Sequence, residues 1–270
     1  MSYKSETFSE GQVLTHDHMN NIVEGLNLSL KGATNYQGKN LSILGDSIST
    51  YSGTIPDGNR DYYTGSNLGV SDVSQMWWHI VKEALGMNLL VNNSWAGRCV
   101  ASTRDSEANM LNSAGGRAEN VAILKTATAE PDVIFVRLGT NDFSYSTPIG
   151  DYDGSSDLTS DISTFRSAYA NMLTELTKQF PNAEVWCGTI PPARRTSTFP
   201  SVVGGRSIEH YNSIIIEMCS LFGCHVLHHA NCGIGWFSKD AFGDYGSAAG
   251  THPNAKGQAL LALQTLRDLV

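Results

Sequence analysis

Five short apolar runs alternate with stretches of helical periodicity along most of this 270-residue chain. The apolar runs cover residues 41–44, 89–91, 133–138, 184–187 and 224–227. The helical stretches cover residues 74–85, 118–126, 162–179, 208–222 and 255–269. Strands that alternate with helices in this way build a parallel sheet with helices on both faces. We therefore predict an α/β fold over residues 39–270, a three-layer αβα sandwich around a flavodoxin-like parallel sheet of five strands.

The first 38 residues differ from this pattern, and we assign residues 1–38 to a helical extension. Between residues 15 and 30 the apolar side chains fall at helical spacing and form one stripe, made of Met19, Ile22, Val23, Leu26 and Leu30. Two interpretations remain open, a helix that packs on the main domain or one that serves homo-oligomerisation or attachment. Residues 8–15 and 18–22 also resemble the opening segment of some phage tail and baseplate proteins, which implies attachment to a virion.

Charge and composition exclude several classes of function. The formal net charge is -8 and Lys and Arg form no cluster, which argues against a nucleic-acid-binding surface. No apolar run approaches the roughly 18 residues that span a bilayer, and residues 1–7 lack the apolar core of a signal peptide. The five cysteines are irregularly spaced and are predicted to be reduced thiols. We expect a cytoplasmic protein, or a virion-associated one if the chain is encoded by a phage.

A group of Cys and His side chains between residues 224 and 232 looks at first like a set of metal ligands. Its members are Cys224, His225, His228, His229 and Cys232. Strand alternation would send His225 and His228 to opposite faces, and the spacing matches no standard zinc pattern. We therefore predict no metal site and no cofactor.

Four short stretches lie where strands end or where the last helix begins. Ser47 lies in Gly-Asp-Ser directly after the first apolar run, and Asn141 lies in Gly-Thr-Asn-Asp directly after the third. Gly97 closes the loop after the second run, and His252 lies in Thr-His-Pro-Asn ahead of the last helix. Taken singly, each stretch is also typical of an ordinary turn or helix cap. Because the carboxyl ends of parallel strands meet at one edge of a sheet, the four residues are expected to converge there.

In this order and context, the four stretches resemble the GDSL-type esterases of the SGNH hydrolase family. The resemblance covers about residues 40–270 and implies the same three-layer fold. It also implies that Ser47 is the nucleophile and His252 the base. The implied oxyanion hole combines the N–H groups of Ser47 and Gly97 with the side chain of Asn141. A base beside the Ser hydroxyl and fixed donors at the oxyanion are what acyl transfer requires.

The carboxylates near these positions are expected to differ in role. Asp46 and Asp142 are predicted to be structural, each accepting hydrogen bonds from backbone N–H groups. The family usually places an Asp three residues before the His, and here that position is Ala249. Asp244 is the nearest carboxylate before His252 in the sequence. Either Asp244 or a backbone carbonyl, which would leave a Ser-His dyad, is expected to orient the imidazole.

Three long connections, residues 50–73, 143–161 and 190–205, are expected to build a substrate site at the same edge. The first carries three tyrosines, Tyr51, Tyr62 and Tyr63, and further aromatic residues follow. The candidate substrate-binding residues are Tyr51, Tyr63, Trp95, Phe143 and Trp236. Aromatic rings beside polar loops suit sugar rings, so we predict O-deacetylation of an acetylated glycan. The alternatives are an acyl-chain esterase, lysophospholipase or thioesterase, and a non-catalytic glycan-binding or virion-attachment module.

Overall fold

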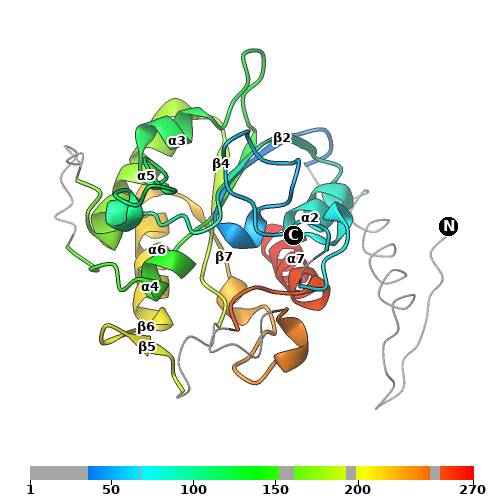
Figure 1. Ribbon diagram of the computed structural model, residues 1–270. Coiled ribbons are helices and arrows are strands. Elements are labelled where there is room, and N and C mark those ends of the chain that lie inside the picture. The colour runs from blue at the N-terminus through cyan, green and yellow to red at the C-terminus, as the bar shows by residue number, and fades with distance from the viewer. Residues whose placement is uncertain (1–35, 67, 152–160, 193–198, 244–249) are drawn as a thin grey trace.

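A parallel sheet of five strands forms the centre of the molecule (Figure 1). The computed structural model describes residues 36–66, 68–151, 161–192, 199–243 and 250–270. The strands are β1 (Asn40–Gly45), β2 (Asn88–Ser94), β3 (Val133–Arg137), β4 (Glu184–Gly188) and β7 (His225–Leu227). They lie in the order β2-β1-β3-β4-β7, and each neighbouring pair is parallel. This arrangement confirms the predicted flavodoxin-like sheet.

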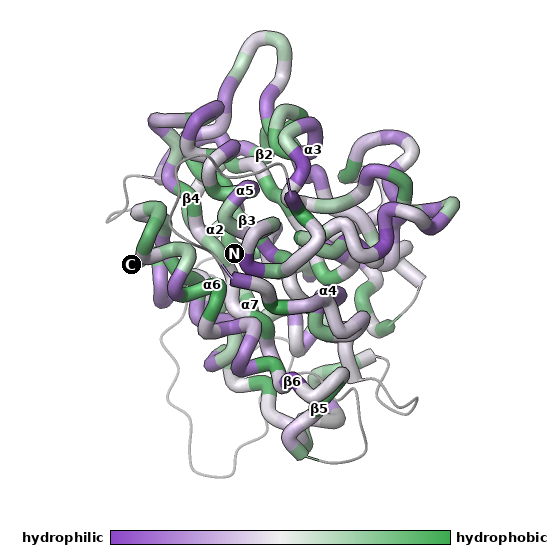
Figure 2. The backbone as a smooth tube through the Cα atoms, turned by 90° about the vertical axis from the view of Figure 1, so that its left-hand side faces the viewer, coloured by the Kyte–Doolittle hydropathy of each residue, from purple (hydrophilic) through white to green (hydrophobic). Residues whose placement is uncertain are grey.

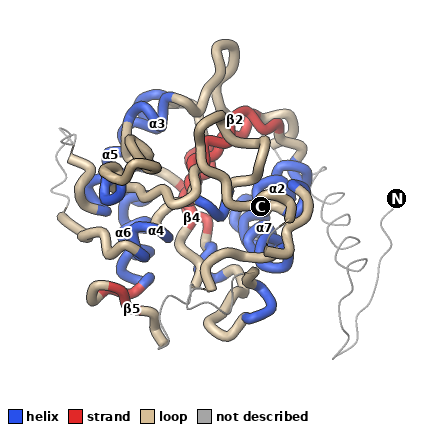
Figure 3. The backbone as a smooth tube through the Cα atoms, in the orientation of Figure 1, coloured by secondary structure: helices blue, strands red, loops and turns tan. Residues whose placement is uncertain are grey.

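Helices cover both faces of the sheet, as Figures 1 and 3 show, and complete the predicted three layers. Two helices, α2 (Trp77–Leu85) and α7 (Ala255–Leu269), pack together on one face. The other face carries α3 (Ala118–Ala122), α5 (Phe165–Gln179) and α6 (Ile208–Phe222). Hydrophobic and hydrophilic stretches alternate along these helices in Figure 2, as expected for elements with one buried face.

Strand β3 shows why both faces must be covered. All five of its residues are buried. Val133 and Phe135 point into the hydrophobic core under α2 and α7, whereas Ile134 and Val136 point into the core under α3, α5 and α6. Burying each of these side chains contributes about 1.5–3 kcal/mol. A continuous apolar run therefore stabilises the fold through both of its faces.

Strand β2 is longer than the apolar run that predicted it. The run ends at residue 91, but the strand continues through Asn92 and Asn93 to Ser94. These polar side chains are buried because each finds a hydrogen-bond partner. Asn92 donates to the Ser49 carbonyl at 3.0 Å and Asn93 donates to the Asn120 carbonyl at 2.8 Å. Hydropathy does not detect such a strand end, since the polar side chains replace apolar packing with hydrogen bonds.

Other element boundaries also differ from the prediction. Helix α3 stops at Ala122, four residues early, and a short antiparallel pair, β5 (Val202–Val203) and β6 (Arg206–Ser207), was not predicted. The five cysteines are free thiols, as predicted. The helix expected between residues 15 and 30 lies outside the described residues. In the described part of the chain, every helix is too short or too polar to cross a membrane.

Candidate active site

Ser47 lies where β1 ends, on the first residue of the short 3-10 helix Ser47–Ser49. Asp46 caps this helix by accepting a 2.9 Å hydrogen bond from the Ile48 N–H. The turn also needs Gly45, because a Cβ there would lie 2.5 Å from Oγ of Ser94 and 2.8 Å from Cβ of Ser49. Ser47 itself is 6% exposed. The tight strand-to-helix turn thus fixes the Ser47 backbone.

His252 reaches Ser47 from the other end of the chain. Nε2 of His252 lies 2.8 Å from Oγ of Ser47, although 205 positions separate the two residues. The backbone N–H of Gly243 donates a 2.9 Å hydrogen bond to the His252 carbonyl. Two residues further on, Asn254 caps α7 by accepting from the Gly257 N–H at 3.1 Å. The His-Pro-Asn sequence therefore ends the incoming loop, presents the imidazole and starts the helix.

Gly97 and Asn141 come together at the carboxyl edge of the same sheet. Gly97 has φ +91°, in the region that favours glycine. Asn141 lies in the first turn of the short helix α4 (Thr140–Ser144), and its Nδ2 donates a 3.0 Å hydrogen bond to the carbonyl of Arg98, the residue after Gly97. The amide side chain predicted as an oxyanion donor is thus held against the predicted glycine loop.

The two structural carboxylates behave as predicted. Asp46 caps the Ser47 turn, as described above, and Asp142 accepts hydrogen bonds from the N–H groups of Val100 and Ala101 at 2.8 and 3.1 Å. Burial raises the pKa of Asp142 to about 7, against the lowering effect of these hydrogen bonds. Asp142 thus ties the loop that follows Gly97 to the helix that carries Asn141.

A buried arginine that sequence reasoning missed joins the two halves of the site. Nη1 of Arg137 lies 3.8 Å from Oδ2 of Asp46 and donates to the hydroxyl of Thr140 at 3.2 Å. The Arg137 carbonyl also accepts the N–H of Asp46 at 3.1 Å. Burial raises the pKa of Asp46 and lowers that of Arg137, and the attraction between the two opposes both shifts. Arg137 therefore contacts the residue before Ser47 and the residue before Asn141.

The group that orients His252 remains a prediction. Asp244 and Ala249, the two positions considered for it, lie outside the described residues. The last described residue before them is Gly243, whose N–H binds the His252 carbonyl.

The predicted substrate-binding aromatics fall into two groups. Tyr63 and Phe143 are fully buried, in the cores on opposite sides of the sheet, so they line no surface and a direct substrate contact is not supported. Their apolar rings serve packing. Tyr51, Trp95 and Trp236 are partly exposed and remain candidates.

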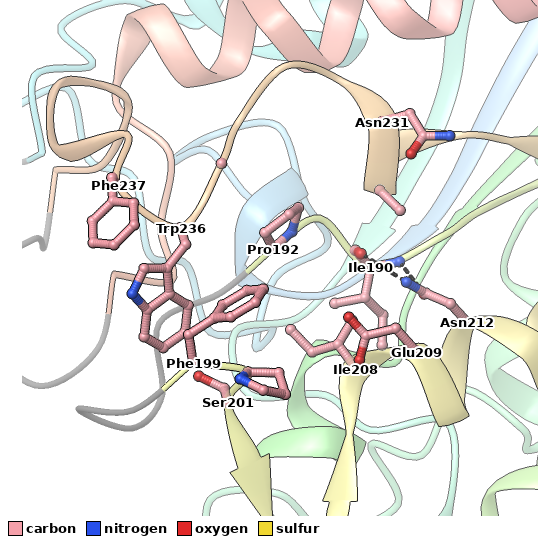
Figure 4. Close-up of a pocket in the computed structure, with 13 residues that line it drawn as sticks. Ile190, Pro192, Phe199, Ser201, Ile208, Glu209, Asn212, Asn231, Trp236 and Phe237 are labelled. Carbon is pink, nitrogen blue, oxygen red and sulfur yellow. Dashed lines mark hydrogen bonds between the residues drawn. The ribbon is translucent and has the colours of Figure 1, made fainter.

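A cavity of about 560 Å³ lies beyond the ends of β4 and β7 (Figure 4). Figure 4 shows Phe199, Trp236 and Phe237 around one end of it and Ile190 at the other. The rings of Phe199 and Trp236 meet edge to face, with centroids 5.3 Å apart. Cδ1 of Ile190 lies 3.1 Å from where a Cβ of Gly139 would be, two residues before Asn141. The cavity thus adjoins the helix that carries Asn141.

A second hollow, of about 410 Å³, lies on the other side of the Ser47 strand, beyond the end of β2. Its lining residues include Arg60, Trp95, Asn109 and Leu111. The Arg60 carbonyl accepts the N–H of Ala96 at 2.8 Å, which fixes the loop that forms one wall. Each hollow therefore contains one of the predicted tryptophans.

The Cys and His group near residue 228 serves other purposes. His229 is fully buried and shares a 2.8 Å hydrogen bond with the hydroxyl of Thr265. His228 lies 3.2 Å from the carboxylate of Asp268. Among the described residues no group of three or more His, Cys, Asp or Glu side chains is arranged to hold a metal ion.

Comparison with known proteins identifies the family. A family model described as GDSL-like Lipase/Acylhydrolase matches residues 39–190, more than half of the chain. The chain belongs to this family. Its membership supports ester hydrolysis as the class of reaction. No curated protein matches the sequence.

Solved structures agree with this assignment. A protein of Bacteroides ovatus described as a GDSL-like lipase is 25% identical, with a TM-score of 0.62 over 84% of this chain and 96% of that one. A second protein so described, from Bacteroides uniformis, is 23% identical, with a TM-score of 0.61 over 85% and 94%. A protein of Agrobacterium tumefaciens described as an arylesterase is 18% identical, with a TM-score of 0.53 over 86% and 100%. At these identities the last two support the fold alone.

Proposed function

We propose that this GDSL-family chain is a serine esterase that removes acetyl groups from a carbohydrate, with Ser47 as nucleophile and His252 as general base. The observation that carries the catalytic part is the 2.8 Å distance between Oγ of Ser47 and Nε2 of His252. A Ser hydroxyl becomes an effective nucleophile when a base within hydrogen-bond reach takes its proton. The contact lies at the predicted edge of the sheet, where β1 ends.

The proposed reaction has two steps. Oγ of Ser47 attacks the ester carbonyl carbon while its proton moves to Nε2 of His252, and the carbonyl oxygen becomes an oxyanion. The tetrahedral intermediate collapses, the alcohol leaves with the proton from His252, and an acyl-Ser47 ester remains. Water activated by His252 then attacks this ester, which releases the acid and regenerates the Ser47 hydroxyl.

The oxyanion is assigned to the N–H groups of Ser47 and Gly97 and to the Asn141 amide. Asn141 is held by its hydrogen bond to the Arg98 carbonyl, and an amide nitrogen has a second N–H to offer. A fixed neutral donor stabilises the developing charge and does not compete for the proton. Removing one such donor costs about 2.7–4 kcal/mol of transition-state stabilisation in a well-studied protease.

The carbohydrate part of the proposal is supported by the two hollows along the sheet edge. Trp95 and Trp236 line one hollow each, together with polar groups such as Arg60 and Asn231. The C–H faces of sugar rings pack on aromatic rings, and their hydroxyls need hydrogen-bond partners beside them. Hollows lined in this way suit the sugar units of an acetylated glycan.

One observation favours a second candidate, an acyl-chain or aryl esterase. The walls of the larger cavity are mostly apolar, with Ile190, Pro192 and Ile208 beside the aromatic residues. Such a cavity would accept an alkyl chain or aromatic ring without polar partners.

A substrate screen separates the two candidates. Acetylated xylan, pectin and bacterial glycans are compared with p-nitrophenyl esters of two to twelve carbons, and preference for the long chains would overturn the carbohydrate assignment. Labelling by a fluorophosphonate tests the catalytic part. It is expected for the wild type and for S213A, a control on α6, and not for S47A. Equal labelling of S47A would refute the assignment of the nucleophile.

A further inference from the structure

Two consecutive tyrosines hold His252 and Pro253. The ring of Tyr62 is stacked on the imidazole of His252, with centroids 3.6 Å apart and an interplanar angle of 19°. The hydroxyl of Tyr63 donates a 2.6 Å hydrogen bond to the Pro253 carbonyl. Tyr63 is fully buried, so this bond is shielded from water. One tyrosine thus contacts the imidazole face while its neighbour holds the backbone next to it.

The same two tyrosines are fastened to the Ser47 turn. The backbone N–H of Tyr62 donates a 3.0 Å hydrogen bond to Oγ1 of Thr50. That hydroxyl in turn donates to the Ser47 carbonyl at 2.9 Å. Thr50 is fully buried. Thr50 and Tyr62 therefore link the backbone of the proposed nucleophile to the ring of the proposed base.

The stacking of Tyr62 on His252 restricts a rotation of the imidazole that the Ser47–His252 hydrogen bond leaves free. The χ2 torsion of His is broad, so one hydrogen bond at Nε2 does not by itself fix the plane of the ring. An aromatic face stacked on the imidazole restricts that plane. The face is also electron-rich and attracts the imidazolium that forms when His252 takes the proton.

We propose that Tyr62 is a positioning residue for His252, and that Tyr63 and Thr50 set its distance from Ser47. This inference rests on the proposed function, because it assumes that His252 is the base. Tyr62 acts through the imidazole rather than on the substrate. Its loss should therefore slow the chemical step without weakening substrate binding.

The test compares Y62L, which removes the ring, with Y62F, which keeps it. With p-nitrophenyl acetate, Y62L is expected to lower kcat by about 10- to 100-fold with KM within twofold of the wild type, because small displacements of a catalytic group cost up to about 10²-fold. Y62F is expected to stay within about twofold. Y36L is the matched control, since Tyr36 is a buried tyrosine that binds Glu184, the first residue of β4, whereas the site lies at the carboxyl ends of the strands.

A double variant excludes a general effect on folding. If Tyr62 acts through His252, Y62L should lower the residual rate of H252A by less than twofold. Equal kcat for Y62L and Y36L, or an undiminished effect of Y62L in H252A, would overturn the inference. Should Y62L not fold, Y63F tests the neighbouring contact, because it removes the hydroxyl that binds the Pro253 carbonyl. The inference then requires Y63F to have a kcat at least threefold below that of the wild type. Failure of the proposed function is distinguishable, because S47A would then keep wild-type activity.

Discussion

The guanidinium of Arg137 lies 3.8 Å from the carboxylate of Asp46, and both side chains are fully buried. This pair joins the strand that ends at the proposed nucleophile to the strand that leads to the proposed oxyanion donor. Its contribution to the site is geometric, since neither charge is exposed to a substrate.

Removing the Arg137 charge is expected to destabilise the fold. R137M leaves the Asp46 carboxylate buried without its cation, which costs about 3–5 kcal/mol in comparable pairs. Urea unfolding measures the loss. R166M is the matched control, because Arg166 pairs with Glu217 at 3.0 Å on the partly exposed surface, where such a pair contributes about 0–1 kcal/mol. Similar losses in the two variants would contradict a special role for the buried pair.

A side chain at Gly97 is expected to damage the proposed oxyanion hole. A Cβ there would lie 2.7 Å from Nη1 of Arg104, and φ is +91°. G97A should therefore lower kcat by about 10-fold or more, as one displaced donor can cost 10²–10³-fold. G38A is the control, since Gly38 has φ +80° but nothing within 4 Å of the added Cβ. Steady-state kinetics of G97A that match those of G38A would contradict a role for Gly97 in the oxyanion hole.

The buried Asp142 predicts a pH dependence of stability. Burial raises its pKa from 3.8 to about 7, so the folded state holds the proton more tightly than the unfolded state. The free energy of unfolding should therefore fall as the pH rises from about 4 to about 7, by up to about 4 kcal/mol. D142N lacks this contribution. Chemical unfolding of the wild type and of D142N at several pH values isolates the contribution of Asp142. If the free energies of unfolding of the two proteins change in parallel with pH, Asp142 does not titrate in this range.

Two variants, one that adds a carboxylate and one that removes a carboxylate, test which group orients His252. A249D places one three residues before His252, where the resemblance to SGNH hydrolases expects it, and should raise kcat. D244N distinguishes the two open interpretations of the wild type. A fall of kcat by about 10-fold or more is expected if Asp244 is the helper, with a ceiling of about 10⁴-fold. An unchanged D244N together with a faster A249D would indicate a Ser-His dyad held by a carbonyl.

The sequence was sufficient for the fold and for part of the site. Alternating apolar runs and helical stretches determine a covered parallel sheet, because the periodicity of burial is local to each element. Ser47, Gly97 and Asn141 could be assigned to one edge, because parallel strands all end there. His252 was recognised through the resemblance, and in the structure its Nε2 lies 2.8 Å from Oγ of Ser47.

Only the tertiary structure decided which neighbours support that edge. Arg137 and Tyr62 reside in segments whose local pattern says nothing about their partners, since Asp46 and His252 are brought to them by the fold. The same holds for Tyr63 and Phe143, whose rings are equally suited to a sugar or to a core and are buried here because each packs into one of the two hydrophobic cores. Sequence periodicity records which side of an element is buried, but the identity of a contact depends on packing between distant residues, such as Ser47 and His252, which are 205 positions apart.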